Sequence, residues 1–178
     1  MKVVCLGDSL TYGFPYDESI SWATALTDML EIETVNRGIN GDTTLGMLNR
    51  FYEDVVMEKP TYVVIMGGTN DAYIGVKLND AKENISKIVE EATKNDIIPV
   101  LALMPPVSDA SEFELKKLRE SIKELAAQKE IYLLDFYSIF LTEEGEFNEV
   151  YFCDDCHPNQ AGYQRMSQQA ALFFRKLV

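Results

Sequence analysis

The chain is poor in basic residues and histidine, and each shortage excludes a class of function. Among 178 residues, 16 Lys and Arg stand against 29 Asp and Glu, which gives a formal charge of −13. Nucleic-acid binders neutralise phosphates with Lys and Arg, so no nucleic-acid partner is expected. One histidine, His157, restricts imidazole chemistry at neutral pH to a single residue. No apolar run approaches the roughly 20 residues of a membrane span.

Cysteine is also scarce, and its odd count of three does not make a disulfide framework. Cys5 lies in the first apolar run and is expected to be a small buried hydrophobe. Cys153 and Cys156 form a C-x-x-C pair, and whether they form a disulfide is open. A zinc site made with His157 would lack an evident fourth ligand, so neither a metal nor a cofactor is expected.

The apolar run at the N-terminus stops at Gly7, after Leu6. A secretory signal needs a longer apolar stretch and a small-residue cleavage site, so a cytoplasmic protein is expected. The length favours one domain over residues 1–178. The oligomeric state cannot be read from the sequence.

Short apolar runs alternate with amphipathic helical patterns along the whole chain. The predicted strands are rich in β-branched and aliphatic residues, and several are nearly continuous, as in parallel strands covered on both faces. They are Val3–Leu6, Ile32–Val35, Tyr62–Met66, Ile97–Leu103 and Ile131–Leu134. This alternation predicts a three-layer α/β fold around a parallel sheet.

Helical spacing of apolar residues predicts the segments between the strands. Ser19 is expected to cap a helix that carries Trp22, and Ser111 with Glu114 resembles a capping box. The remaining expected helices are Thr43–Val56, the stripe Leu78–Ala92, the stripe Leu115–Leu125 and the stripe Tyr163–Leu177.

Four polar motifs follow strands or precede the last helix. They are Gly7-Asp8-Ser9-Leu10, Gly38-Ile39-Asn40-Gly41-Asp42-Thr43, Gly67-Gly68-Thr69-Asn70-Asp71 and Asp154-Asp155-Cys156-His157-Pro158. Because parallel strands end at one edge of their sheet, where such sheets bind ligands, these motifs are expected to converge there.

Together these residues make a nearly complete set for acyl transfer. The Ser9 hydroxyl needs a base, and His157 can remove its proton. Asp154, three residues before the histidine, can hold the imidazole, and Asp155 is the rival for that role. Gly41 and Asn70 can donate a backbone N–H and an amide N–H to a developing oxyanion.

On these four blocks, in order, the sequence resembles the SGNH hydrolases, also called the GDSL lipase/esterase family. The resemblance implies a flavodoxin-like α/β/α fold with sheet order 2-1-3-4-5, and a serine esterase without metal or organic cofactor. It places Ser9, Asp154 and His157 in the triad and Ser9, Gly41 and Asn70 in the oxyanion hole. Relatives act on short-chain esters, acetylated sugars, lysophospholipids and thioesters. The short chain favours small or short-chain acyl esters as small-molecule substrates.

Alternatives remain for each assignment. Ser9 is also a plausible helix cap, and Gly41 and Asn70 suit tight turns. A flavodoxin-like binding domain without catalysis is the rival function. An α/β-hydrolase is disfavoured because Thr11 stands where a G-x-S-x-G elbow needs glycine. Four aromatic residues near the motifs either line an acyl or alcohol pocket or pack loops: Tyr12, Phe14, Tyr16 and Tyr73.

Overall fold

The computed structural model describes residues 1–177, and its centre is a five-stranded parallel sheet. The strand order is β2-β1-β3-β4-β5, which confirms the expected fold class and topology. The strands are β1 (Lys2–Gly7), β2 (Glu33–Gly38), β3 (Tyr62–Met66), β4 (Ile98–Leu103) and β5 (Tyr132–Asp135).

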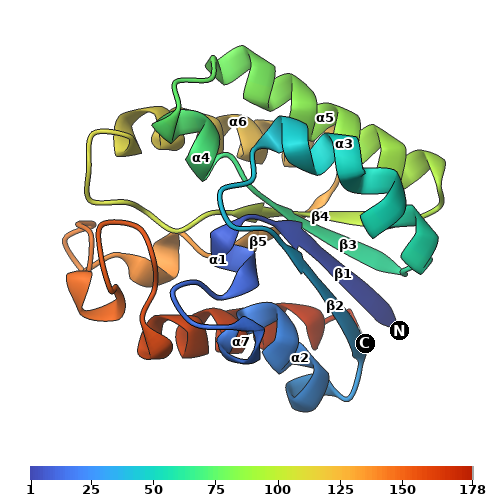
Figure 1. Ribbon diagram of the computed structural model, residues 1–178, viewed down its shortest axis with the longest axis horizontal. Helices are drawn as coiled ribbons and strands as arrows, with labels where there is room; N and C mark the ends of the chain where they lie inside the picture. The colour runs from blue at the N-terminus through green and yellow to red at the C-terminus, as the bar shows by residue number, and fades with distance from the viewer. Residues whose placement is uncertain (178) are drawn as a thin grey trace.

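Helices cover both faces of the sheet, which gives the predicted three layers (Figure 1). One layer holds α3 (Thr44–Asp54), α4 (Thr69–Tyr73), α5 (Leu78–Lys94) and α6 (Glu112–Lys129). The other holds α1 (Ser9–Tyr12), α2 (Trp22–Leu30) and α7 (Gln160–Phe174). Four short 3₁₀ turns lie in the connections, at Glu18–Ile20, Val56–Glu58, Ser138–Phe140 and Glu149–Tyr151. No helix among the described residues is both long and apolar enough to cross a membrane.

The position of each strand in the sheet explains its sequence. β1 and β3 lie inside the sheet, and their side chains are buried on both faces, so they are continuous apolar runs. β2 lies at the edge and is only half-buried. It therefore tolerates Asn36 and Arg37 and extends to Gly38, beyond the predicted end at Val35.

Two predicted helix caps are wrong. Ser21, not Ser19, caps α2 by accepting a hydrogen bond from the Ala23 N–H. Ser19 instead lies in a 3₁₀ turn that Asp17 caps. Ser111 makes no capping bond at α6, so the predicted capping box with Glu114 is absent.

At the start of α6, Glu112 folds back instead. Its carboxylate accepts from the Val107 N–H and forms an ion pair with the buried Arg119. Glu114, the residue that the capping box requires, pairs with Lys117 within α6 instead, and the bond from Val107 to Glu112 ties the loop after β4 to the helix.

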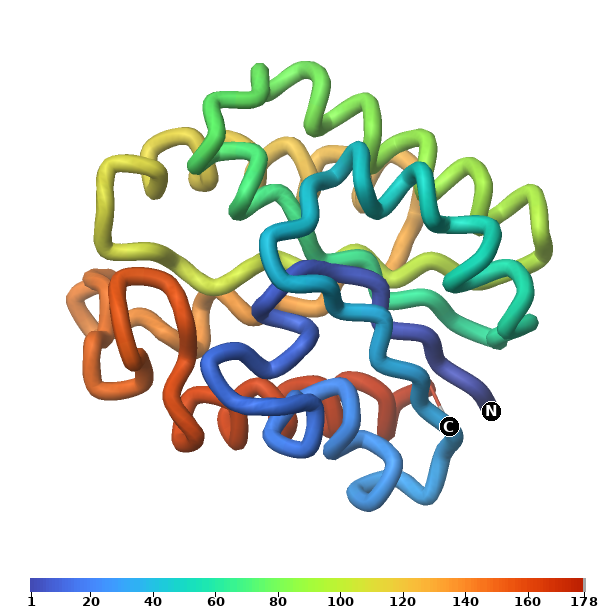
Figure 2. The backbone as a smooth tube through the Cα atoms, viewed as in Figure 1, coloured from blue at the N-terminus to red at the C-terminus, as the bar shows by residue number. Residues whose placement is uncertain are grey.

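The carboxyl ends of all five strands lie on the same side of the molecule, at the left of Figure 1. The loops that leave this edge pack on one another, as the trace in Figure 2 shows for the segments before α6 and before α7. There the Ser108 N–H donates to the Asp155 carbonyl at 2.9 Å. The four motifs therefore converge on one edge, as predicted.

Candidate active site

Ser9, His157 and Asp154 form a chain of hydrogen bonds at the carboxyl edge of the sheet. Ser9 Oγ lies 3.2 Å from His157 Nε2. On the other side of the ring, Nδ1 lies 2.9 Å from Asp154 Oδ2 and 3.1 Å from Oδ1. An ionised carboxylate only accepts, so it selects the tautomer with hydrogen on Nδ1 and leaves Nε2 free to accept from the Ser9 hydroxyl.

The loop before α7 fixes the carboxylate. Asp154 Oδ1 accepts from the backbone N–H groups of His157 at 2.7 Å and Cys156 at 2.9 Å. Partial burial raises the pKa of Asp154, but the hydrogen bonds from His157 and Cys156 outweigh it, and the pKa lies below its usual value. The carboxylate is therefore ionised at neutral pH. Asp155 points away and accepts from the Ser108 hydroxyl at 2.5 Å, so the geometry places Asp154 on the imidazole.

Ser9 is the first residue of α1, and Asp8 caps that helix. The Asp8 carboxylate accepts from the Leu10 N–H at 2.9 Å. Ser9 lies beneath the loops of this sheet edge and is 8% exposed. Its neighbour Asp8 is 1% exposed. The first N–H of a helix has no acceptor within the helix, so the hydrogen bonds of α1 do not use the Ser9 N–H.

Gly41 lies in the turn after β2, and Asn70 lies in α4. A hydrogen bond from Asn70 to Asp42, the residue after Gly41, joins the two. The Asn70 amide donates to the Asp42 carbonyl at 2.9 Å, with one of its two N–H groups. Gly41 has a φ of +77°, which glycine adopts without strain. In the described part of the chain, the Gly41 N–H donates no hydrogen bond.

The three aspartates beside the motif residues accept hydrogen bonds from backbone amides of the turns and helix starts. Asp8 bonds to Leu10, Asp42 accepts from the Thr43 N–H, and Asp71 accepts from both the N–H and the hydroxyl of Thr44. Asp71 thereby joins α4 to the start of α3.

Two residues that the sequence did not single out hold the loops together. Arg50 Nε donates to Asp42 at 2.7 Å, and its Nη2 donates to the Gly7 carbonyl at 2.9 Å. The buried Tyr163 hydroxyl donates to the Phe14 carbonyl at 2.7 Å. Arg50 lies 43 positions from Gly7 and Tyr163 lies 149 positions from Phe14, so only the helical stripe of Tyr163 could be read beforehand.

The aromatic residues near the motifs divide between the two expected roles. The Phe14 ring packs edge-on against the His157 ring, with 4.7 Å between centroids, and is 38% exposed. The Tyr16 hydroxyl lies 3.5 Å from Cys153 Sγ. Phe14 therefore faces the candidate site, whereas Tyr16 packs one loop on another.

All three cysteines are free thiols. Cys153 is exposed and Cys156 is buried, and burial raises the pKa of Cys156 to about 12. Among the described residues, no three His, Cys, Asp or Glu side chains gather as a metal site. The absence of a metal and of a cofactor stays a prediction.

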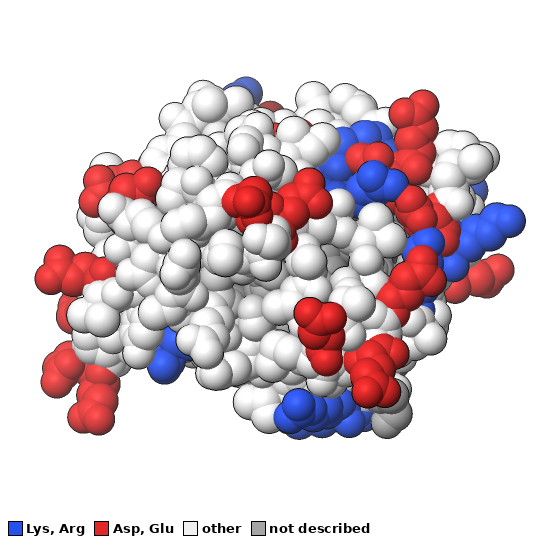
Figure 3. Space-filling view, turned by 60° about the horizontal axis from the view of Figure 1, so that its bottom comes forward, with Lys and Arg blue, Asp and Glu red and all other residues white. Residues whose placement is uncertain are grey.

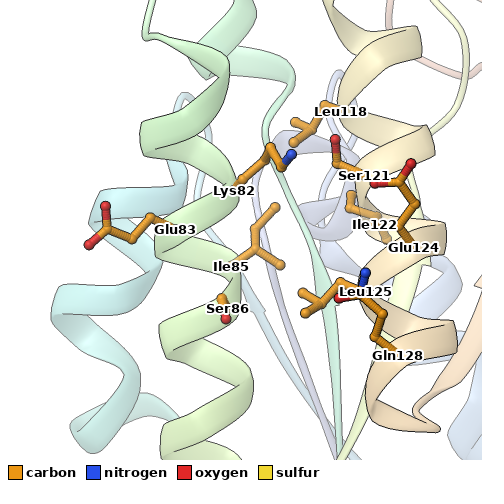
Figure 4. Close-up of a pocket in the computed structure, with 10 residues that line it drawn as sticks. All are labelled: Lys82, Glu83, Ile85, Ser86, Leu118, Ser121, Ile122, Glu124, Leu125 and Gln128. Carbon is orange, nitrogen blue, oxygen red and sulfur yellow. The ribbon is translucent and has the colours of Figure 1, made fainter.

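A groove of about 380 Å³ lies between α5 and α6, away from these residues (Figure 4). Ile85, Leu118, Ile122 and Leu125 form its apolar wall, and polar side chains such as Lys82 and Glu124 surround them. None of the predicted site residues lines this groove.

Comparison with known proteins gives one consistent family. The model of the GDSL-like lipase/acylhydrolase family matches residues 5–165. Esterase TesA of Pseudomonas aeruginosa is 26% identical over 92% of the chain and 83% of its own length. An uncharacterized lipoprotein, YqeF of Bacillus subtilis, is 34% identical, but the match spans 61% of this chain and half of the lipoprotein.

A solved structure assigned to the G-D-S-L lipolytic family, from Desulfitobacterium hafniense, has the same architecture. It is 34% identical, has a TM-score of 0.91, and the match covers 97% of this chain and 98% of that one. The cytoplasmic location expected from the sequence stays a prediction.

Proposed function

Because the chain belongs to the GDSL-like lipase/acylhydrolase family, whose members hydrolyse carboxylic esters, we propose that it is a serine esterase with a Ser9–His157–Asp154 triad. The observation that carries this proposal is the hydrogen-bond chain of 3.2 Å and 2.9 Å through the one imidazole of the protein. Nucleophile, base and orienting acid in this order are the arrangement that activates a serine hydroxyl.

In the proposed reaction, Ser9 Oγ attacks the ester carbonyl while His157 Nε2 takes its proton. The ionised Asp154 stabilises the resulting imidazolium. His157 then gives the proton to the leaving alkoxide, and a water molecule repeats the two steps to release the acid from Ser9.

Three N–H groups support an oxyanion hole at Ser9, Gly41 and Asn70. The Ser9 N–H is the first of α1, the Gly41 N–H makes no bond within the described chain, and Asn70 keeps a second amide N–H. Donors held in place before the reaction stabilise the charge that develops on the carbonyl oxygen.

Small or short-chain acyl esters are the proposed substrates. An open cavity of about 420 Å³ lies beside the Gly41 turn and is lined by Thr43 and Asp71. Leu45, Ile74 and Val76 form its apolar part, the charged Asp80, Glu83 and Lys87 also line it, and the triad residues do not. Hydrolysis rates on p-nitrophenyl acetate, butyrate, octanoate and palmitate test this: kcat/KM is expected to fall from butyrate onward. A maximum at octanoate or beyond would contradict the short-chain preference.

The test of the triad is Ser9→Ala. We expect the loss of several orders of magnitude in kcat on p-nitrophenyl acetate and no labelling by a fluorophosphonate, which reacts only with an activated serine. Ser121→Ala, in the groove between α5 and α6, is the matched control and should keep both.

The rival function, a binding domain without catalysis, predicts no labelling of the wild-type chain. Unchanged far-ultraviolet circular dichroism shows that each variant is folded. A folded Ser9→Ala protein with wild-type turnover would overturn the mechanism.

A further inference from the structure

The loops at the carboxyl edge of the sheet carry far more negative than positive charge. These are residues 8–21, 39–43, 67–77, 104–111 and 136–159. Lys77 is their single basic residue. Their acidic residues are Asp8, Asp17, Glu18, Asp42, Asp71, Asp109, Glu143, Glu144, Glu146, Glu149, Asp154 and Asp155.

The exposed acids of these loops are not neutralised. Within the described residues, Asp17, Glu18, Asp155 and the four glutamates from 143 to 149 form no ion pair with Lys or Arg. The opposite edge differs, because Lys2 pairs with Glu33 and Glu58, and Arg37 also pairs with Glu58. On the left side of Figure 3, where Figure 1 draws the loops before α7, the charged patches among the white residues are mainly red, whereas red and blue alternate on the right.

Two of the unpaired acids lie next to the proposed catalytic carboxylate. Glu149 and Asp155 line a cavity of about 310 Å³ together with Asp154, and the rings of Phe147 and Phe152, which pack on each other, also line it. Arg165 of α7 donates to the Ile139 carbonyl and the Tyr151 hydroxyl of this edge, and its positive charge offsets only one of the acids. The negative charge therefore begins within the site.

Negative charge around the entrance of the site acts on the substrate before and during binding. Unpaired charges beside a low-dielectric cleft change the local concentration of a charged substrate and its association rate by about 10- to 10³-fold. At physiological salt the effect extends about 8 Å, which is the scale of a small ester. We propose that this site selects esters without negative charge and favours alcohols that carry a positive charge. This selectivity rests on the proposed esterase function.

Three acetate esters of similar shape test the inference. Acetylcholine is cationic, 3,3-dimethylbutyl acetate replaces its ammonium by a neutral carbon, and the acetate ester of 2-hydroxyethanesulfonate is anionic. Acid release is followed in a pH-stat, so one readout serves all three. We expect kcat/KM to fall in this order, with about a tenfold or greater ratio between cation and anion at low salt. The ratio should shrink in about 0.3 M NaCl, while the neutral ester responds little.

Charge reversal locates the effect. Glu146→Lys with Glu149→Lys should lower the cation-to-anion ratio several-fold. Glu53→Lys with Glu124→Lys is the matched control. Both of its residues are exposed, lie on α3 and α6 and make no side-chain bond in the described structure, so it alters the net charge equally. It should keep the wild-type ratio.

Each outcome separates the two proposals. Hydrolysis of the neutral ester without any order by charge would overturn the selectivity and leave the esterase function intact. An equal change in both double variants would assign the effect to net charge and overturn the role of these loops. No hydrolysis of any of the three esters, the neutral one included, would count against the esterase function itself.

Discussion

Asn70 has two amide N–H groups with different tasks in the proposed site. One donates to the carbonyl oxygen of Asp42 and so stabilises that turn, and the second is free to donate to the oxyanion. Asn70→Ala is expected to lower kcat by about 10²–10³ with little change in KM, because the lost bond forms only when charge develops. Steady-state kinetics on p-nitrophenyl acetate measure this.

Asn84→Ala is the matched control for that variant. The Asn84 amide donates to the Thr44 hydroxyl, at the start of α3, and is not a proposed oxyanion donor. We expect it to change kcat less than Asn70→Ala does. A loss at Asn70 that is confined to KM would make it a substrate-binding residue instead of an oxyanion donor.

Asp8 gives a second prediction at the residue scale, because its carboxyl group is buried beside the nucleophile. Burial raises the pKa of Asp8 from 3.8 to about 7, and the charges of Asp42 and Asp71 add to the rise. The Oδ2 atom has no hydrogen-bond partner among the described residues. Between these two pH values the folded protein binds more protons than the unfolded chain, so the free energy of unfolding falls as the pH rises.

Asp8→Asn removes this titration and keeps an oxygen that can cap α1. The stability of the variant relative to the wild type should therefore increase from about pH 4 to about pH 7, by at most about 4 kcal/mol, and then stay constant. Urea unfolding across this range measures the difference. A difference that is independent of pH would mean that Asp8 keeps an ordinary pKa in the folded protein.

At the scale of elements, the position of Ser9 depends on how closely α1 approaches the ends of β1 and β2. Gly38 ends β2 against the backbone of α1, and a Cβ there would lie 2.6 Å from the Cα of Tyr12. Backbone atoms cannot yield as side chains do. Gly38→Ala is therefore expected to displace α1, to destabilise the fold by about 1–3 kcal/mol and to lower kcat.

A displacement of about 1 Å at the nucleophile can cost about 10²-fold in rate, which is the expected loss for this variant. Gly145→Ala is the control for stability alone: a Cβ there would meet nothing within 4 Å, but the φ of +85° strains an alanine, so this variant should lose stability and keep kcat. Kinetics and thermal unfolding of both variants separate the two effects. Wild-type kcat in a folded Gly38→Ala protein would show that α1 does not need this close approach.

The elements also show which parts of the fold the sequence predicts. The inner strands β1 and β3 are predicted well, because burial on both faces leaves a continuous apolar run. The edge strand β2 is predicted too short, because its polar half faces solvent. The short helix α4 is not predicted, since its five residues have no helical stripe.

In the candidate site, too, the features that depend on local sequence are predictable and those that depend on distant packing are not. Asp154 and His157 are predictable because their spacing of three within one loop brings the side chains together. Arg50 and Tyr163 are not, because their contacts with Gly7 and Phe14 exist only after distant segments pack. The capping box at Ser111 does not form, because Glu114 pairs with Lys117 on the exposed side of α6 instead.

At the scale of the whole molecule, the net charge of −13 is distributed unevenly. Most ion pairs lie on the helices and at the start of the sheet, for example Arg37 with Glu58 and Lys87 with Glu83. Exposed pairs of this kind stabilise a protein little. Many of the unpaired acids lie instead at the edge that carries the candidate site. The carboxylates there repel one another as well as anionic ligands.

This repulsion predicts that salt stabilises the protein. Raising NaCl from about 10 mM to about 0.3 M shortens the Debye length from about 30 Å to below 8 Å and screens the repulsion between like charges. We expect the midpoint of thermal unfolding to rise over this range. The variant with lysine at 53 and 124 has a net charge of −9 instead of −13 and should show a smaller rise. The variant with lysine at 146 and 149 has the same net charge but relieves the acidic edge, so its rise should be the smallest of the three. Equal salt dependence in all three proteins would mean that the repulsion is too weak to affect folding, and a falling midpoint would mean that the screened ion pairs dominate.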